Sequence, residues 1–200
     1  MRIKTLVVGT LYTNCYIVSE GDEAFIIDPG AEADYILEQV KGLKVKAILA
    51  THGHFDHILA VERLKRALKA PFLIHPADGW IMEESLKWIN PPRPAPGIDA
   101  PLIGELDLKG HKFEVIHTPG HTPGSVSILV DNEILFSGDT LFQGSVGRYD
   151  FPGSSLEDLK KSIKKLMELP DHVKVYPGHG GETTIGDERR ENWFIITYLL

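Results

Sequence analysis

Three histidines and one aspartate lie within seven residues of this chain, in the segment THGHFDH at positions 51–57. Both side-chain types coordinate metal ions, histidine through a ring nitrogen and aspartate through a carboxylate oxygen. Packing four ionisable groups together costs free energy unless a cation offsets the burial and the repulsion. The segment therefore predicts a metal site, with these candidate ligands: His52, His54, Asp56 and His57.

Three more candidate ligands follow later apolar runs that are typical of strands. Each lies in a short loop that contains glycine, and the three are His121 in TPGHTPG, Asp139 in SGD and His179 in PGH. Loops at strand ends are where layered α/β proteins build their sites, and glycine and proline give such loops defined backbones. We expect all seven side chains to meet at one place.

Seven ligands are too many for a single catalytic zinc, which usually takes three protein ligands and keeps one open position. They suit two divalent ions that share one carboxylate and one water. Imidazole and carboxylate without thiolate favour zinc, with iron and manganese as alternatives. Taken singly, Asp56 could instead cap a helix that begins near Ile58, and His121, Asp139 and His179 could be ordinary loop residues.

The elements that must position these residues alternate between two hydrophobic periods. Strand-like runs occupy residues 16–18, 25–27, 47–49, 72–74, 115–116, 127–130, 134–136 and 173–176. Apolar side chains fall on one helical face at residues 33–40, 58–68 and 156–166. Asp131 and Asn132 predict a hairpin turn, and Ser154 with Glu157 has the spacing of a capping box. This order predicts a layered α/β sandwich formed by one domain, residues 1–200.

Composition and termini limit the function classes. Lysine and arginine number 21 against 28 acidic residues, a balance of −7, which argues against nucleic-acid binding through a broad basic surface. Cys15 is the only cysteine, so no intramolecular disulfide can form, which fits a cytoplasmic protein.

The apolar run at residues 6–8 is too short for a signal peptide, and WFIITYLL at 193–200 is too short to span a membrane. We expect that apolar end to be buried in the core, with a homodimer interface as the alternative. The other four histidines have no matching partner spacing and are interpreted as structural, with His117 the nearest to the site.

Taken together, the seven residues resemble the metal motifs of the metallo-β-lactamase fold superfamily, from about Leu11 to the C-terminus. Asp28 in IDPG matches an early aspartate that supports the metal loop in that superfamily. The resemblance implies an αββα sandwich with the site at one edge of the paired sheets. It also implies that one ion is held by His52, His54 and His121, and the other by Asp56, His57 and His179, with Asp139 bridging.

Within the superfamily, segments 138–154 and 176–192 resemble the glyoxalase II-like hydrolases, which cleave thioesters such as hydroxyacylglutathione. The chain resembles a short member that lacks the C-terminal helical domain. This implies hydrolysis of a small-molecule thioester by a hydroxide that bridges the two metals. Asp56 would be a catalytic residue that orients the hydroxide. The resemblance places substrate contacts at Arg148, and we expect the aromatic residue that follows it, Tyr149, to bind substrate as well.

Other functions remain open at this point. One alternative is a persulfide dioxygenase that uses a single iron, held by His52, His121 and Asp139. Another is a lactonase of the same superfamily. A third is a binding module that senses metal without catalysis.

Overall fold

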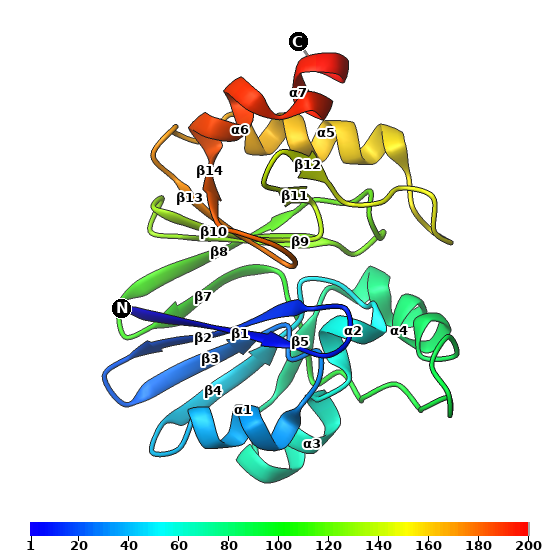
Figure 1. Cartoon of the computed structure of the whole chain (residues 1–200). Coiled ribbons are helices and arrows are strands. Elements are labelled where there is room, and N and C mark those ends of the chain that lie inside the picture. Colours follow the sequence, from blue (N-terminus) through cyan, green and yellow to red (C-terminus); the bar gives the residue numbers. More distant parts are fainter. Residues whose placement is uncertain (200) are drawn as a thin grey trace.

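Two six-stranded sheets face each other, and helices cover the outer side of each sheet (Figure 1). The computed structural model describes residues 1–199, so Leu200, the last residue of the predicted domain and of its apolar end, lies outside the described residues. The strand order is β1-β2-β3-β4-β5-β6 in the first sheet and β14-β13-β10-β9-β8-β7 in the second. This αββα arrangement confirms the predicted fold class.

The first half of the chain forms the first sheet and its helices. Its strands are β1 (Arg2–Val8), β2 (Thr13–Glu20), β3 (Glu23–Ile27), β4 (Lys44–Leu49), β5 (Phe72–Ile74) and β6 (Ala100–Pro101). Its helices are α1 (Ala33–Gln39), α2 (Phe55–Ile58), α3 (Val61–Leu68) and α4 (Gly79–Ser85), with a 3-10 turn at Pro76–Asp78. Strands β1 to β3 pair antiparallel, whereas β3 to β6 pair parallel.

The second half forms the other sheet. Its strands are β7 (Gly104–Leu108), β8 (His111–His117), β9 (Val126–Val130), β10 (Ile134–Gly138), β13 (Lys174–Pro177) and β14 (Thr183–Thr184). A separate small hairpin consists of β11 (Leu141–Phe142) and β12 (Ser145–Val146). Its helices are α5 (Leu156–Leu166), α6 (Ile185–Glu191) and α7 (Trp193–Tyr198).

Side-chain alternation along the strands produces three apolar layers. Because successive strand residues point to opposite faces, Ile17, Ile26 and Ile48 pack toward α1 and α3, whereas Phe25 and Leu49 pack between the sheets. The inter-sheet layer receives Phe113, Val126, Ile128, Val130 and Phe136 from the second sheet. A third layer lies between the second sheet and its helices and includes Leu135, Leu159, Ile163, Val175 and Ile195.

The predicted elements agree with the structure in most places. Each predicted strand is observed, and Asp131 and Asn132 both take positive φ (51° and 56°) in the turn between β9 and β10, where Glu133 N donates to Val130 O at 2.9 Å. The helical face at residues 58–68 is split between α2 and α3. Strands β1 and β7 were not predicted from the sequence. Each is the edge strand of its sheet and has too few buried residues to show the period-two hydrophobic pattern of a strand.

One predicted helix start is wrong by one residue. Ser155, not Ser154, is the N-cap of α5, and its hydroxyl accepts a hydrogen bond from Asp158 N at 3.1 Å. The hydroxyl of Ser154 instead donates to the carbonyl oxygen of His121 at 2.7 Å. The residue predicted to cap the helix therefore holds one of the site loops.

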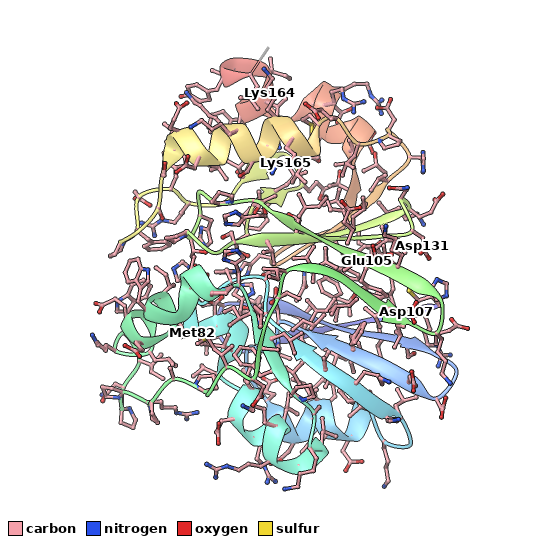
Figure 2. The ribbon with its side chains drawn as sticks, turned by 180° about the vertical axis from the view of Figure 1, so that it is seen from behind. Met82, Glu105, Asp107, Asp131, Lys164 and Lys165 are labelled. Atoms are coloured by element: carbon pink, nitrogen blue, oxygen red, sulfur yellow. The ribbon has the colours of Figure 1, made fainter. Side chains whose placement is uncertain are left out.

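Charged side chains occupy the outer surfaces. Figure 2 shows Lys164 and Lys165 on α5, and Glu105 and Asp107 on β7, which is the edge strand of the second sheet. Both acidic residues are exposed, while Leu108 between the sheets is buried. Charges on an edge strand oppose pairing with another chain, so this edge is protected from sheet extension.

The apolar end of the chain is buried on one side only. Phe194 and Ile195 of α7 are buried, as predicted, but Trp193, Ile196 and Tyr198 are 51%, 47% and 47% exposed. A homodimer through this exposed side stays a prediction, which light scattering of the purified protein would test. Within residues 1–199, no helix is long and apolar enough to cross a membrane.

Candidate metal centre

Four strands deliver the predicted ligands to the same edge of the sandwich. Strand β4 leads into the segment 51–57, β8 leads into His121, β10 ends just before Asp139, and β13 ends two residues before His179. The structure brings all seven side chains together. Asp56 lies inside α2 and does not cap a helix, so its alternative structural role is excluded.

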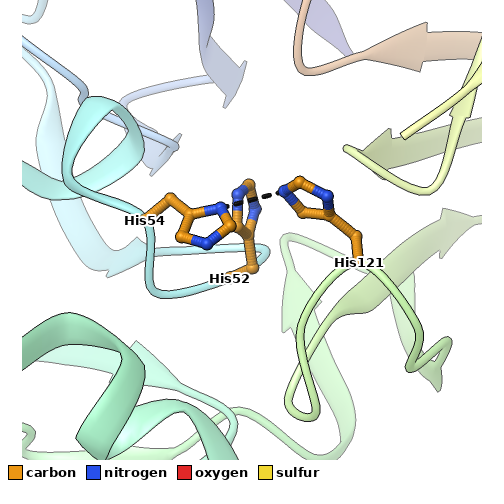
Figure 3. A group of neighbouring side chains, drawn as sticks. All are labelled: His52, His54 and His121. Atoms are coloured by element: carbon orange, nitrogen blue, oxygen red, sulfur yellow. Dashed lines mark hydrogen bonds between the residues drawn. The ribbon is translucent and has the colours of Figure 1, made fainter. Parts of the chain in front are cut away.

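Three histidines form one half of the cluster. Figure 3 shows His52 and His54 on one loop facing His121 on another. His54 Nδ1 lies 2.9 Å from His121 Nε2, and all three side chains are buried. Each offers a ring nitrogen, and these atoms lie within 4.8 Å of one another. That is the spacing of three ligands around one ion.

The other half combines one carboxylate with two histidines. Asp56 Oδ2 lies 3.4 Å from His57 Nε2 and 3.2 Å from His179 Nε2. Ligand atoms of these three residues also lie within 4.8 Å of one another. This second group could hold a second ion beside the first.

Asp139 lies between the two halves. Its Oδ2 is 3.6 Å from His121 Nε2 in the first half and 3.5 Å from His179 Nε2 in the second. Its Oδ1 is 3.4 Å from His57 Nε2. A carboxylate in this position can contact two ions at once, which fits the bridging role that the resemblance implies.

The far nitrogen of several histidines is held by an acceptor outside the cluster. His121 Nδ1 donates to the carbonyl oxygen of Arg148 at 2.8 Å, and His179 Nδ1 donates to that of Leu11 at 3.0 Å. His57 Nδ1 lies 3.1 Å from Asp28 Oδ2. Such contacts place the ring proton on Nδ1 and turn the Nε2 lone pair toward the cluster, as in histidines that bind metal.

The donor atoms of the cluster fit a pair of divalent cations. His52 Nε2 and Asp139 Oδ1 are buried and have no hydrogen-bond partner in the described chain. Buried polar atoms without partners are rare, because each forfeits its interaction with water. A cluster of imidazole nitrogens and carboxylate oxygens with such unpaired atoms therefore has the composition of a dinuclear metal site.

The two halves differ in their protonation. Burial and the neighbouring His121 lower the pKa of His54 to about 3, and burial likewise lowers that of His52. Burial also lowers the pKa of His57, but the carboxylates of Asp56 and Asp139 raise it by more, to about 9. The same carboxylates raise the pKa of His179 to about 10 against its burial. At pH 7 His52 and His54 are therefore neutral, whereas His57 and His179 are imidazolium ions in the metal-free chain.

Metal uptake at pH 7 is therefore expected to release about two protons from side chains, because a histidine must be deprotonated to bind metal. These protons come from His57 and His179, and their release should disappear well above pH 10, where both side chains are already neutral. Isothermal titration of the metal-free protein in buffers of different ionisation enthalpy measures this number. A buffer-independent heat at pH 7 would contradict the assignment.

Glycines let neighbouring backbones approach the ligands. A Cβ on Gly30 would lie 1.6 Å from Asp56 O, and one on Gly147 would lie 1.7 Å from Asp139 O. A Cβ on Gly178 would lie 2.1 Å from Asp139 Oδ1 and 2.8 Å from His57 Cε1. The site could not keep this geometry with larger residues at these positions.

A Gly178→Ala variant should lose bound metal, because its methyl group must displace Asp139 from between the two halves. We expect a loss of metal affinity of at least about tenfold. Metal content after dialysis against a weak chelator measures it. Gly79→Ala is the matched control, since its nearest atom would lie 3.9 Å away and its φ is −53°. Equal metal content in the two variants would disprove the steric argument.

Three polar residues outside the cluster support its loops. Asp28 accepts hydrogen bonds from Thr51 N and Oγ1, both at 2.7 Å, as the resemblance implies. Thr13 Oγ1 donates to Asp56 Oδ2 at 2.9 Å. Asp78, fully buried, was not identified from the sequence, although it follows strand β5 in the way that the ligands follow theirs.

Asp78 joins the two loops that carry the three histidines. It accepts hydrogen bonds from Gly53 N at 2.7 Å and Gly124 N at 2.6 Å, and from Thr122 Oγ1 at 2.7 Å. Gly53 lies between His52 and His54, and Thr122 follows His121. The carboxylate therefore fixes the distance between the loops.

A cavity of about 320 Å³ opens beside the cluster. Arg148 lines it, but Tyr149 does not, because the Tyr149 ring lies 6.3 Å from Phe194 on α7. Aromatic residues missed by the sequence analysis, Trp88 and Phe151, line the cavity instead. His117 stays outside the cluster and stacks on His75 with ring centroids 4.3 Å apart.

Comparison with known proteins extends over almost the whole chain. A protein of Aquifex aeolicus is 43% identical over 204 residues, which is 97% of each chain. The protein of Haemophilus influenzae named hydroxyacylglutathione hydrolase GloC is 38% identical over 98% of each chain.

Solved structures show the same fold. The BLEG-1 B3 metallo-beta-lactamase superposes with a TM-score of 0.88 at 36% identity, covering 97% of this chain and 99% of that one. TTHA1623 in a di-iron-bound form gives 0.85 at 41% identity, covering 96% and 99%. ETHE1 from Myxococcus xanthus gives 0.81 at 28% identity, covering 96% and 84%. The model of the metallo-beta-lactamase superfamily matches residues 8–179. The chain therefore belongs to the metallo-beta-lactamase superfamily.

Proposed function

We propose that this protein is a dinuclear metal-dependent hydrolase that cleaves acyl thioesters of the hydroxyacylglutathione type. The observation that carries the proposal is the convergence of seven ligand side chains in two groups, joined by Asp139, beside an open cavity. The relative from Haemophilus influenzae, named as a hydroxyacylglutathione hydrolase, supports the substrate class.

The residues would divide between two divalent ions as the geometry groups them. His52, His54 and His121 would hold one ion, Asp56, His57 and His179 the other, and Asp139 would contact both. Zinc suits this donor set, and the di-iron form of the similar TTHA1623 supports iron as the alternative. When bound, the pair supplies hydroxide at neutral pH and polarises the carbonyl oxygen of the substrate.

Asp56 is placed to orient the attacking oxygen. Its Oδ2 is held by the hydroxyl of Thr13 and by its contact with His179 Nε2, so the carboxylate cannot rotate freely. Attack forms a C–O bond at the carbonyl carbon and breaks the C–S bond, and the electron pair leaves on sulfur. Because a thiolate is stable near neutral pH, this step needs no strong general acid.

The single-iron persulfide dioxygenase uses fewer of these residues. It would engage His52, His121 and Asp139 and leave four buried or half-buried ligand side chains without a function. His54 Nδ1 lies only 2.9 Å from His121 Nε2, which fits a shared ion better than an idle neighbour. The similarity to ETHE1 makes oxygen uptake the necessary comparison assay.

The test combines metal analysis and turnover on one preparation. Protein purified without added metal is analysed for its elements and assayed with S-lactoylglutathione, a hydroxyacyl thioester. We expect two ions per chain and release of free thiol without oxygen consumption. Oxygen uptake with glutathione persulfide and no thioester cleavage would overturn the proposal. So would cleavage of lactones alone by the protein with two bound ions.

A further inference from the structure

An aromatic wall borders the three-histidine half of the cluster. The rings of Trp88 and Phe151 lie 5.6 Å apart, and they lie 5.6 Å and 5.3 Å from the ring of His54. Phe151 also lies 6.1 Å from His121. Trp88 comes from the segment after α4 and Phe151 from the segment before α5, so two distant parts of the chain build the wall.

The wall is open to the cavity. Both residues line the cavity that holds the metal-binding side chains, and Trp88 is 44% exposed in the described chain. A large apolar surface left open beside a catalytic centre is a binding surface more often than a packing defect. Tryptophan and phenylalanine offer flat faces that stack well on aromatic or bulky apolar groups.

Among the cavity-lining residues that the structure describes, Arg148 is the only lysine or arginine. Its guanidinium lies over one face of the Phe151 ring, 4.0 Å from the ring centroid, and forms two hydrogen bonds with Asp150, at 2.9 Å and 3.0 Å. The guanidinium is therefore already paired with a carboxylate of the chain itself.

The position of the wall identifies which part of a substrate it can contact. The carbonyl that reacts must lie between the two ligand groups, within reach of both. A short group attached to the carbonyl carbon on the His54 side then reaches Trp88 and Phe151, whose rings lie 5.6 Å and 5.3 Å from that of His54. The charged ends of a glutathionyl group are many bonds farther away and can extend toward solvent.

Resting on the thioesterase function proposed above, we propose that Trp88 and Phe151 determine acyl specificity. The preferred substrates are thioesters whose acyl group carries an aromatic or bulky apolar substituent next to the carbonyl carbon. The acyl group is uncharged, because Arg148, the one lysine or arginine among the described residues that line the cavity, is paired with Asp150.

Two thioesters of the same thiol test this proposal. S-lactoylglutathione and S-mandeloylglutathione differ only in a methyl or a phenyl group beside the carbonyl. Trp88→Ala and Phe151→Ala should each lower the ratio of kcat/KM for mandeloyl over lactoyl by about tenfold, with metal content unchanged. Trp88→Phe should keep most of the ratio, since an aromatic face remains. Trp193→Ala, an exposed tryptophan on α7, is the matched control and should not change it.

The outcomes separate the inference from the function on which it rests. If the metal-loaded protein cleaves both thioesters and Trp88→Ala leaves the ratio unchanged, the wall does not set specificity and the inference is overturned. If the metal-loaded protein cleaves neither thioester, the proposed function fails and the inference with it. If Phe151→Ala unfolds the segment before α5, the Trp88→Ala variant still tests the inference, because the Trp88 side chain is exposed and its removal leaves the fold intact.

Discussion

An Asp139→Ala variant is expected to lose bound metal and hydrolytic activity together. Asp139 lies within 3.6 Å of ring nitrogens in both halves of the cluster. Without its carboxylate, each of the two proposed ions would lose a ligand, and His57 and His179 would lose the negative charge that lies between them. We expect fewer than two ions per chain after dialysis and a loss of kcat/KM of more than about 100-fold, since removal of outer partners alone already costs 10–100-fold.

Elemental analysis and thioester turnover on the same sample measure both effects. Asp22→Ala is the matched control, because the Asp22 side chain is exposed and forms an ion pair with Lys109 on the surface of the protein. Its metal content and turnover should equal those of the unmodified protein. Two ions still bound to Asp139→Ala would refute the bridging position of this carboxylate.

Removal of the buried Asp78 carboxylate is expected to have the largest effect on stability. An Asp78→Ala change leaves Gly53 N, Gly124 N and Thr122 Oγ1 without their acceptor in a site closed to water. Each buried donor left unpaired costs about 1–3 kcal/mol, so we expect a loss of about 3–5 kcal/mol in the free energy of unfolding. Denaturant unfolding of the metal-free protein measures this loss.

Asp78→Asn separates the structural effect from the effect on metal. The amide keeps one acceptor oxygen but presents an NH2 group to one of the donors, so the two loops should shift apart. We expect metal affinity of the three-histidine half to fall about 10–100-fold, while the chain still folds. Asp107→Ala, at an exposed position of β7, is the control. Unchanged affinity in Asp78→Asn would mean that the carboxylate does not position the loops.

The ligands could be predicted because their signal is local. Four ionisable residues within segment 51–57 have no common structural use, and His121, Asp139 and His179 each follow a recognisable strand. Strand β4 belongs to the first sheet and β8, β10 and β13 to the second, and the packing of the two sheets brings their ends to a common edge. Most of the strands were visible as short continuous apolar runs, because they are buried on both faces.

The supporting residues could not be predicted in the same way. A single aspartate after a strand, such as Asp78, has the same sequence pattern as a turn residue, and only the packing of two loops around it shows its function. The choice between Tyr149 and Phe151 depends on the backbone between β12 and α5. There the Arg148 carbonyl accepts from His121 Nδ1, and Gly147 packs against Asp139 O.

The sequence by itself determined the layered fold, the seven candidate metal ligands and their kinship with a metal-dependent family. It could do so because residue type and hydrophobic pattern are properties of short segments. Only the tertiary structure decided that the candidate ligands form two groups, with lowered pKa values at His52 and His54 and raised ones at His57 and His179, that Asp139 lies between the groups, and that Trp88 and Phe151 border the cavity. Those features depend on distances between loops that are far apart in the chain, and such distances are set by how the two sheets pack together.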